Sequence, residues 1–187
     1  DCLLSRGLGD VYKRQIIFVI YENKIKQPLV DFDIFKNKGY TGATISNFML
    51  NGVAGGTLIV VNTFYQQKLD FNSQETGYIS LTYLIAVLIM IRVGEMILQS
   101  LGPKRPLLLG SALTVIGLIL LSLTFLPNAW YITSSVIGYL LFGTGLGIYA
   151  TPSTDTAVAQ APDDKVGVAS GVYTVSYTHL TLPTKRI

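Results

Sequence analysis

The stretch Leu107–Leu126, LLLGSALTVIGLILLSLTFL, is 20 residues long and contains no charged side chain. At about 1.5 Å of rise per residue, a helix of this length spans about 30 Å, which is the thickness of the hydrocarbon core of a bilayer. Uncharged apolar runs of this length are typical of transmembrane helices. The stretch therefore predicts an integral membrane protein.

The composition of the whole chain agrees with this interpretation. Of its 187 residues, 50% are hydrophobic and 13% are charged, whereas soluble domains carry about 25% charged residues. The formal net charge of +3 is too small to indicate a nucleic-acid partner. We expect the lipid bilayer to be the main partner of the chain.

The chain offers little for enzymatic or metal chemistry. It has one cysteine, Cys2, and one histidine, His179, and each lies in a terminal segment. A Cys/His metal site or a Cys–His pair cannot be built from these two residues, and Glu95 is the one carboxylate in the predicted spans. We therefore expect no catalytic residues, no metal site and no cofactor.

Three further stretches are long and apolar enough to cross the membrane. They are Gly42–Tyr65, Gly77–Leu98 and Ile132–Thr151. Ile16–Tyr21 resembles the end of an earlier span, and Val166–Val175 resembles the start of a later one. The expected fold is an all-α integral membrane protein with four complete transmembrane helices and a partial helix at each end.

The two terminal segments do not fit this pattern. Residues 1–15, DCLLSRGLGDVYKRQ, and 176–187, SYTHLTLPTKRI, resemble translated library-adapter sequences. The second contains a proline, a histidine and two adjacent cations, so we expect it not to continue the helix that opens at Val166, because a membrane helix cannot stop inside the bilayer. We expect residues 16–175 to be the membrane domain of a longer protein. The alternative is a genuine short polar tail.

The distribution of Lys and Arg between the loops predicts the orientation, because positively charged loops stay in the cytoplasm. The links 22–40 and 99–106 and the stretch after the fourth span hold seven cations, and the opposite links hold Lys68 alone. The seven are Lys24, Lys26, Lys36, Lys38, Lys104, Arg105 and Lys165. Loops 22–40 and 99–106 are therefore expected to be cytoplasmic.

The first span carries a polar face. Asn47, Asn51, Asn62 and Gln66 fall at about 0°, 40°, 60° and 100° around the helix, at about 100° per residue. Burying an unpaired amide in lipid is costly, so these side chains should face other helices or a water-filled cavity. The sequence leaves both possibilities open, lining of a substrate cavity and hydrogen bonding between helices.

Charged residues near the cytoplasmic ends of two spans are candidates for gating. Arg92 and Glu95 are three residues apart and can form an ion pair on one helix face. Asp155 follows Pro152, where the fourth span is expected to kink or end. The alternatives are an interfacial ion pair and a solvated or capping carboxylate.

Glycines are frequent in the fourth span and recur in the first. Gly143 and Gly147 have the GxxxG spacing that lets two helix backbones approach closely, and Gly52 and Gly56 repeat it. The stretch GTGLG lies inside a span, so a nucleotide-binding loop is rejected.

Several motifs resemble the 14-span drug:proton antiporter group of the major facilitator superfamily, which includes the QacA-like and EmrB-like exporters. KQPLVDFDIFKNKGY resembles the entry to the ninth span, and PDDKVGVASG resembles a later cytoplasmic link. In GEMILQSLGPKRPLLLG, three positions match the cytoplasmic loop motif of the superfamily, namely Gly102, Lys104 and Arg105. Gln99 replaces the usual acidic residue, which puts a charge relay through this loop in doubt.

The resemblance implies a part of a proton-coupled secondary transporter in the cell membrane. Such a protein would export lipophilic or cationic drugs by alternating access, with a small-molecule substrate and protons as its partners. A carrier of a sugar or another metabolite, and a membrane scaffold without transport activity, are the alternatives.

Overall fold

The computed structural model describes residues 17, 20, 21, 32–162 and 165–181. All the regular elements in these residues are helical. They are η1 (Phe32–Lys36), α2 (Lys38–Lys68), α3 (Ser73–Leu101), α4 (Lys104–Leu121), α5 (Asn128–Ala159) and α6 (Val166–Thr181). Four of them, α2 to α5, are long and apolar enough to cross a membrane. The predicted all-α membrane fold with four complete spans is confirmed. Residues 1–15, 22–31 and 182–187 lie outside the described part of the chain.

Two helices begin at side-chain caps that the sequence contains. Asn37 accepts a hydrogen bond from the Gly39 N–H at the start of α2. Asn72 and Glu75 form a capping box at the start of α3, in which each side chain accepts from a backbone N–H of the other residue. These caps satisfy backbone donors that a helix start leaves free, and they place the starts of α2 and α3 four residues before the predicted spans.

Two predicted span ends differ from the structure by five residues or more. Helix α4 ends at Leu121, because the chain turns at Ser122–Leu126 before Pro127, so the predicted end at Leu126 is wrong. Helix α5 passes through Pro152 and ends at Ala159, so the possible end at Pro152 is wrong as well. Proline removes one backbone donor, and a membrane helix tolerates it where neighbouring helices surround it. Pro152 is fully buried, as this explanation requires.

Helix α6 also extends beyond its predicted limit. It runs from Val166 to Thr181, six residues past Val175, so the expectation that the helix stops at Ser176 is wrong. The first proline of this terminal segment is Pro183, and Ser176–Thr181 contains neither proline nor glycine. Polar residues alone do not break a helix, which accounts for the continuation.

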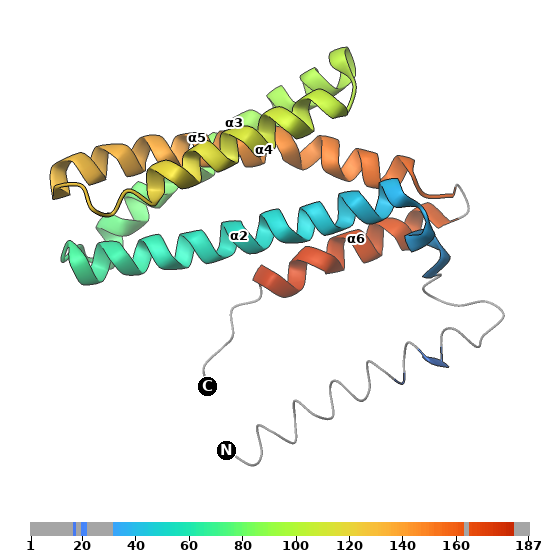
Figure 1. Ribbon diagram of the computed structural model, residues 1–187, viewed down its shortest axis with the longest axis horizontal. Coiled ribbons are helices and arrows are strands. Elements are labelled where there is room, and N and C mark those ends of the chain that lie inside the picture. The colour runs from blue at the N-terminus through green and yellow to red at the C-terminus, as the bar shows by residue number, and fades with distance from the viewer. Residues whose placement is uncertain (1–16, 18–19, 22–31, 163–164, 182–187) are drawn as a thin grey trace.

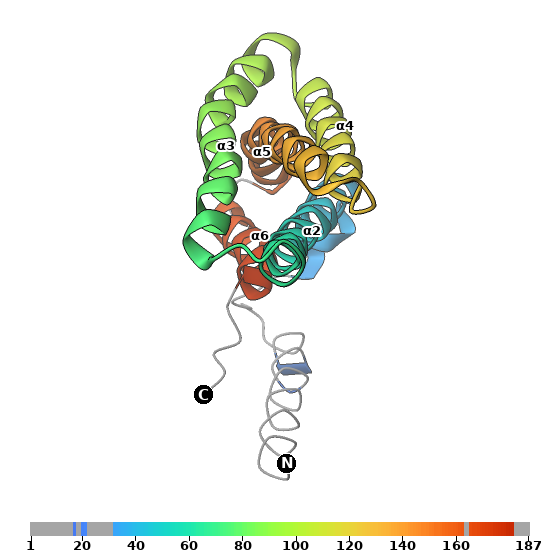
Figure 2. The same ribbon diagram turned by 90° about the vertical axis from the view of Figure 1, so that its left-hand side faces the viewer.

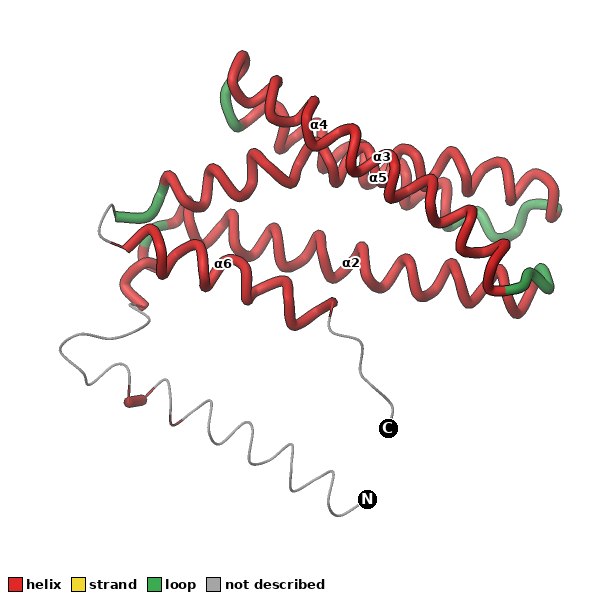
Figure 3. Tube along the Cα trace, turned by 180° about the vertical axis from the view of Figure 1, so that it is seen from behind, coloured by secondary structure: helices red, strands yellow, loops and turns green. Residues whose placement is uncertain are grey.

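Helix α5 is the centre of the bundle. It lies between α3 and α4, and α2 and α6 lie side by side beneath it, as Figure 2 shows end-on and Figures 1 and 3 show from two sides. Half of the most apolar 18-residue stretch of α5 is buried inside the bundle. The corresponding share is 11% for α3, 22% for α2 and 28% for α4. The other three spans therefore expose apolar faces that lipid or further helices must cover.

The glycines of α5 explain how it can touch two neighbours at once. A Cβ atom on Gly143 would lie 2.5 Å from the Tyr83 carbonyl oxygen of α3, and one on Gly145 would lie 2.5 Å from the Gly110 carbonyl oxygen of α4. These two glycines are about 200° apart around the helix, so they mark opposite faces. Backbone-to-backbone packing of α5 on both sides follows from them.

Candidate functional site

The inner face of α2 is the row of α2 side chains that the bundle buries. Its members recur at intervals of three, four or seven residues: Tyr40, Thr44, Asn47, Ala54, Val61 and Tyr65. This spacing places them on one stripe of the helix. The stripe faces α5 and α6, and it coincides with one edge of the polar face that the sequence predicts.

Asn47 and Asn51 form a polar unit in the N-terminal half of α2. The Asn51 Nδ2 donates to the Asn47 backbone oxygen and to Asn47 Oδ1, at 2.9 Å in both cases. Asn47 and Thr44 are each 6% exposed, and neither Asn47 Nδ2 nor Thr44 Oγ1 has a hydrogen-bond partner among the described residues. Unpaired buried polar atoms are rare and costly, so these two atoms stand out in the described part of the bundle.

Asn62 lies in the opposite half of α2 and connects three helices. Its Oδ1 accepts from the Ser80 hydroxyl of α3 at 2.9 Å and from the Tyr139 hydroxyl of α5 at 3.3 Å. Gln66, one turn further on, is exposed. The four predicted polar residues are therefore not brought together in one place.

Tyrosines supply most of the other polar contacts between helices, and the sequence analysis missed them. Tyr149 donates to Ser46 Oγ at 2.7 Å between α5 and α2, and Tyr40 donates to the Ala169 oxygen at 2.8 Å between α2 and α6. Hydroxyl pairs also join Tyr65 to Ser135 and Ser153 to Tyr173. A buried tyrosine hydroxyl needs a partner, so the presence of tyrosines within apolar spans signals polar contacts between helices, although it does not identify the partners.

The charged candidates lie at the surface of the described chain. Arg92 Nη1 and Glu95 Oε2 are 2.6 Å apart, the ion pair that their spacing predicts, and their side chains are 79% and 36% exposed. Asp155 is exposed near the end of α5. Within the described part of the chain, none of these three side chains forms a hydrogen bond or ion pair with the inner face of α2.

The predicted cytoplasmic loop motif forms the turn between α3 and α4. Gly102 has φ +75°, a backbone conformation that favours glycine, and its N–H donates to the Leu98 oxygen at 3.0 Å. Lys104 and Arg105 are exposed in the first turn of α4. This motif therefore ends one helix and begins the next.

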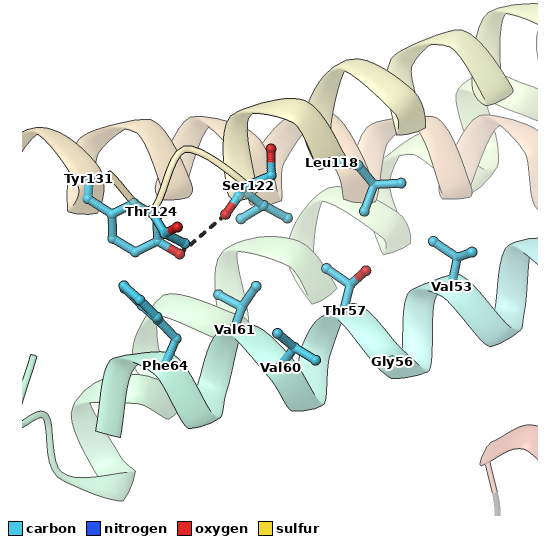
Figure 4. A pocket seen from close by; sticks show the side chains of 11 residues that line it. Val53, Gly56, Thr57, Val60, Val61, Phe64, Leu118, Ser122, Thr124 and Tyr131 are labelled. Atoms are coloured by element: carbon cyan, nitrogen blue, oxygen red, sulfur yellow. Dashed lines mark hydrogen bonds between the residues drawn. The ribbon is translucent and has the colours of Figure 1, made fainter. Parts of the chain in front are cut away.

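A groove between α2 and α4 holds two cavities, and we call it the α2–α4 groove. The outer cavity, of about 560 Å³, is shown in Figure 4, where Val53 and Thr57 of α2 lie opposite Leu118 of α4, and Phe64 lies opposite Tyr131 of α5. The inner cavity, of about 420 Å³, lies between Lys38–Ser46, Leu107–Ser111 and the Tyr149–Thr156 part of α5. The surface of the outer cavity is mainly apolar, and Thr57, Ser122, Thr124 and Tyr131 also line it.

The described residues contain no cluster of side chains that could bind a metal ion. Within residues 32–162 and 165–175, no three His, Cys, Asp or Glu side chains come together as a metal site would require.

Sequence comparison identifies the family. The sequence profile of the Major Facilitator Superfamily matches residues 12–180, which is nearly the whole chain. This chain belongs to the major facilitator superfamily. Members of the superfamily are multi-pass membrane transporters and not enzymes, which fits the helical spans described above.

Among curated proteins, the chain is similar to the quinolone resistance protein NorB of Staphylococcus aureus. It is 60% identical over 157 residues to NorB of the strains Newman and COL, and equally to that of strain JH9. The match covers 84% of this chain and 34% of each relative. The chain therefore spans about a third of the length of the curated relatives that it matches.

Proposed function

We propose that this chain is part of a secondary transporter of the cell membrane that exports small lipophilic or cationic drugs, quinolones among them. The observation that carries the proposal is the 60% identity over 157 residues to a quinolone resistance protein. We further propose that the proton gradient drives export and that the intact protein works by alternating access, with substrate and protons as its partners.

The substrate cavity in this proposal includes the polar face of α2. Asn47, Asn51, Asn62 and Gln66 contribute neutral hydrogen-bonding groups, and Phe48, Phe64 and Tyr65 contribute aromatic surface. The unpaired Asn47 Nδ2 and Thr44 Oγ1 support this assignment, since both can donate to an acceptor on a substrate. An apolar wall with a few placed polar groups suits a lipophilic drug.

The charged residues have separate roles in this proposal. The Arg92–Glu95 pair and Asp155 act at the cytoplasmic gate, where an ion pair that breaks and forms can bias two conformations. Loops 22–40 and 99–106 face the cytoplasm, with Lys104 and Arg105 in the second of them. The excess of cations in these loops supports this orientation.

A chimeric transporter tests drug export. Residues 38–175 of this chain replace the matching stretch of NorB, and the chimera is expressed in a strain that lacks its own quinolone exporters. We expect quinolone resistance close to that given by NorB, and loss of resistance when a protonophore collapses the gradient. A chimera that reaches the membrane at NorB levels without conferring resistance would favour the carrier of another metabolite.

The cavity assignment has its own test. Asn51→Leu in the chimera should change the relative resistance to different drugs without preventing membrane insertion. Thr63→Val is the matched control, because Thr63 is exposed on α2 and its hydroxyl donates to the Ile59 oxygen of the same helix. If Asn51→Leu leaves resistance to every drug unchanged, the polar face of α2 does not line the cavity.

A further inference from the structure

The ion pair of Arg92 and Glu95 lies at the depth of the hydrocarbon core. Helix α3 runs from Ser73 to Leu101, so its middle residue is Val87. Arg92 is about 7.5 Å and Glu95 about 12 Å from that residue along the helix axis, at about 1.5 Å per residue. With the helix centred on a hydrocarbon core about 30 Å thick, both residues lie inside the core. Charged side chains at this depth face a bundle interior or a water-filled cavity, because lipid does not solvate them.

The pair points away from α5. A Cβ atom on Gly94 would lie 2.6 Å from the Ile148 backbone oxygen, so the Gly94 side of α3 packs on α5. Arg92 is about 200° from Gly94 around the helix, and its side chain is 79% exposed. The ion pair therefore lies on the opposite face of α3, and that face has to border water or further protein rather than lipid.

The Glu95 carboxylate occupies only part of the Arg92 guanidinium. Arg92 Nη1 donates to Glu95 Oε2 at 2.6 Å, and this is the one hydrogen bond of the Arg92 side chain within the described part of the chain. A guanidinium has five N–H donors in a planar fork that matches the two oxygens of a carboxylate. Ion pairs between exposed neighbours on a helix are weak. A carboxylate from outside the helix can therefore replace Glu95 on Arg92.

The surface beside Arg92 is apolar. Leu81, Ile85, Leu88 and Ile89 are 45–69% exposed, and they lie within about 60° of Arg92 around α3. They extend about 17 Å along the helix from Arg92, which is long enough for the aromatic body of a drug. An apolar strip with one cation at its end suits a lipophilic molecule that carries a carboxylate. Quinolones combine a flat aromatic body with such a carboxylate.

We propose that Arg92 recognises the carboxylate of lipophilic drugs such as quinolones, and that this carboxylate displaces Glu95. The inference rests on the proposed function and deepens it, because it names the chemical class of substrate that the ion pair reads. The drug and Glu95 compete for one guanidinium, so the ion pair opens when the drug binds. This competition gives the proposed gate a direct link to the substrate.

Two matched ligands test the recognition of the carboxylate. They are a fluoroquinolone and its methyl ester, which has the same aromatic body without the negative charge. Their intrinsic fluorescence measures binding to the purified chimera in nanodiscs. We expect Arg92→Gln to weaken quinolone binding by about ten-fold, because hydrogen bonds between two charged groups are lost. Binding of the ester should change by less than about two-fold, because the ester forms no ion pair with Arg92.

A second variant tests the competition with Glu95. Glu95→Gln removes the competing carboxylate, so quinolone binding should tighten by about two-fold or more. The two variants are thus expected to act in opposite directions, whereas an ion pair with a purely structural role would be lost equally in both. Lys68→Gln is the matched control, because it removes an exposed cation at the far end of α2 and should change neither affinity.

Three results would overturn the proposal. They are an unchanged quinolone affinity in Arg92→Gln, an equal loss of both ligands in Arg92→Gln, and effects of the same sign in Arg92→Gln and Glu95→Gln. The binding measurement does not need transport, so its failure and the failure of drug export are distinguishable. A chimera that binds the quinolone through Arg92 without conferring resistance would uphold the recognition and overturn export. A chimera that confers resistance while Arg92→Gln binds the quinolone like the parent would do the reverse.

Discussion

Asn62 and Gln66 are neighbours on the predicted polar face, yet they have different surroundings. Asn62 accepts hydrogen bonds from Ser80 and Tyr139, whereas Gln66 is exposed in the last turns of α2. The position of a residue around a helix predicts the side that it faces. The partners it meets there depend on helices up to 77 residues away in the sequence.

Replacement of Asn62 should reveal a structural role. Asn62→Leu removes the acceptor for two hydroxyls, and we expect it to destabilise the chimera by about 1 kcal/mol, since hydrogen bonds between membrane helices contribute about 0.6–1.7 kcal/mol. The measurement is the free energy of unfolding in mixed detergent micelles. Gln66→Leu, which removes no recorded contact, should change it by less than about 0.5 kcal/mol. Equal effects of the two variants would contradict a structural role for Asn62.

Helix α5 can pack in the centre of the bundle because it has small residues on opposite faces. Gly143 meets the backbone of α3 and Gly145 meets that of α4. Thr114 of α4 also contacts the position where a Cβ atom of Gly145 would lie. Because backbone atoms cannot move aside as a flexible side chain can, these contacts leave no room for a larger residue.

A single methyl group on α5 should therefore be poorly tolerated. We expect Gly145→Ala to destabilise the bundle by about 3 kcal/mol, at the upper end of the cost of overpacking. Gly77→Ala, at an open position of α3, should be neutral or slightly stabilising, since alanine favours helix over glycine by up to about 1 kcal/mol. Thermal unfolding of the two chimeric variants measures the difference, and a stable Gly145→Ala protein would contradict the packing of α5 against α4.

The sequence predicts the elements better than their contacts. Apolar length alone identifies all four spans, but it does not predict the caps at Asn37 and Asn72, which start α2 and α3 four residues earlier than expected. The ends of α4 and α5 are less predictable, because the tolerance of Pro152 depends on the helices that surround it. The contact between Tyr149 and Ser46 joins residues 103 positions apart, and no local pattern indicates such a pair.

For the whole molecule, the ends of the bundle differ in charge. The start of α2, the turn between α3 and α4 and the link between α5 and α6 lie toward one end, and the links 69–72 and 122–127 lie toward the other, as Figure 1 shows. The first end carries Lys36, Lys38, Lys104, Arg105 and Lys165. This arrangement agrees with the expected cytoplasmic side, which remains a prediction.

Cysteine labelling from outside intact cells tests the orientation. In a chimera without other cysteines, Ser73→Cys and Asn128→Cys should react with a membrane-impermeant maleimide. Ser100→Cys should react only after the cells are permeabilised. All three residues are exposed in the structure, so differences in reactivity report the side of the membrane. The reverse pattern would invert the predicted topology.

The unequal lengths of the spans have a consequence for the surrounding bilayer. Helix α4 has 18 residues, and α2, α3 and α5 have 31, 29 and 32. At about 1.5 Å per residue these lengths are about 27 Å for α4 and about 43–48 Å for the others. The long helices can tilt in a thin bilayer, but α4 cannot lengthen in a thick one. Lipids with long acyl chains would then have to compress beside α4, so the thickness of the host membrane would affect the packing of this helix in the bundle.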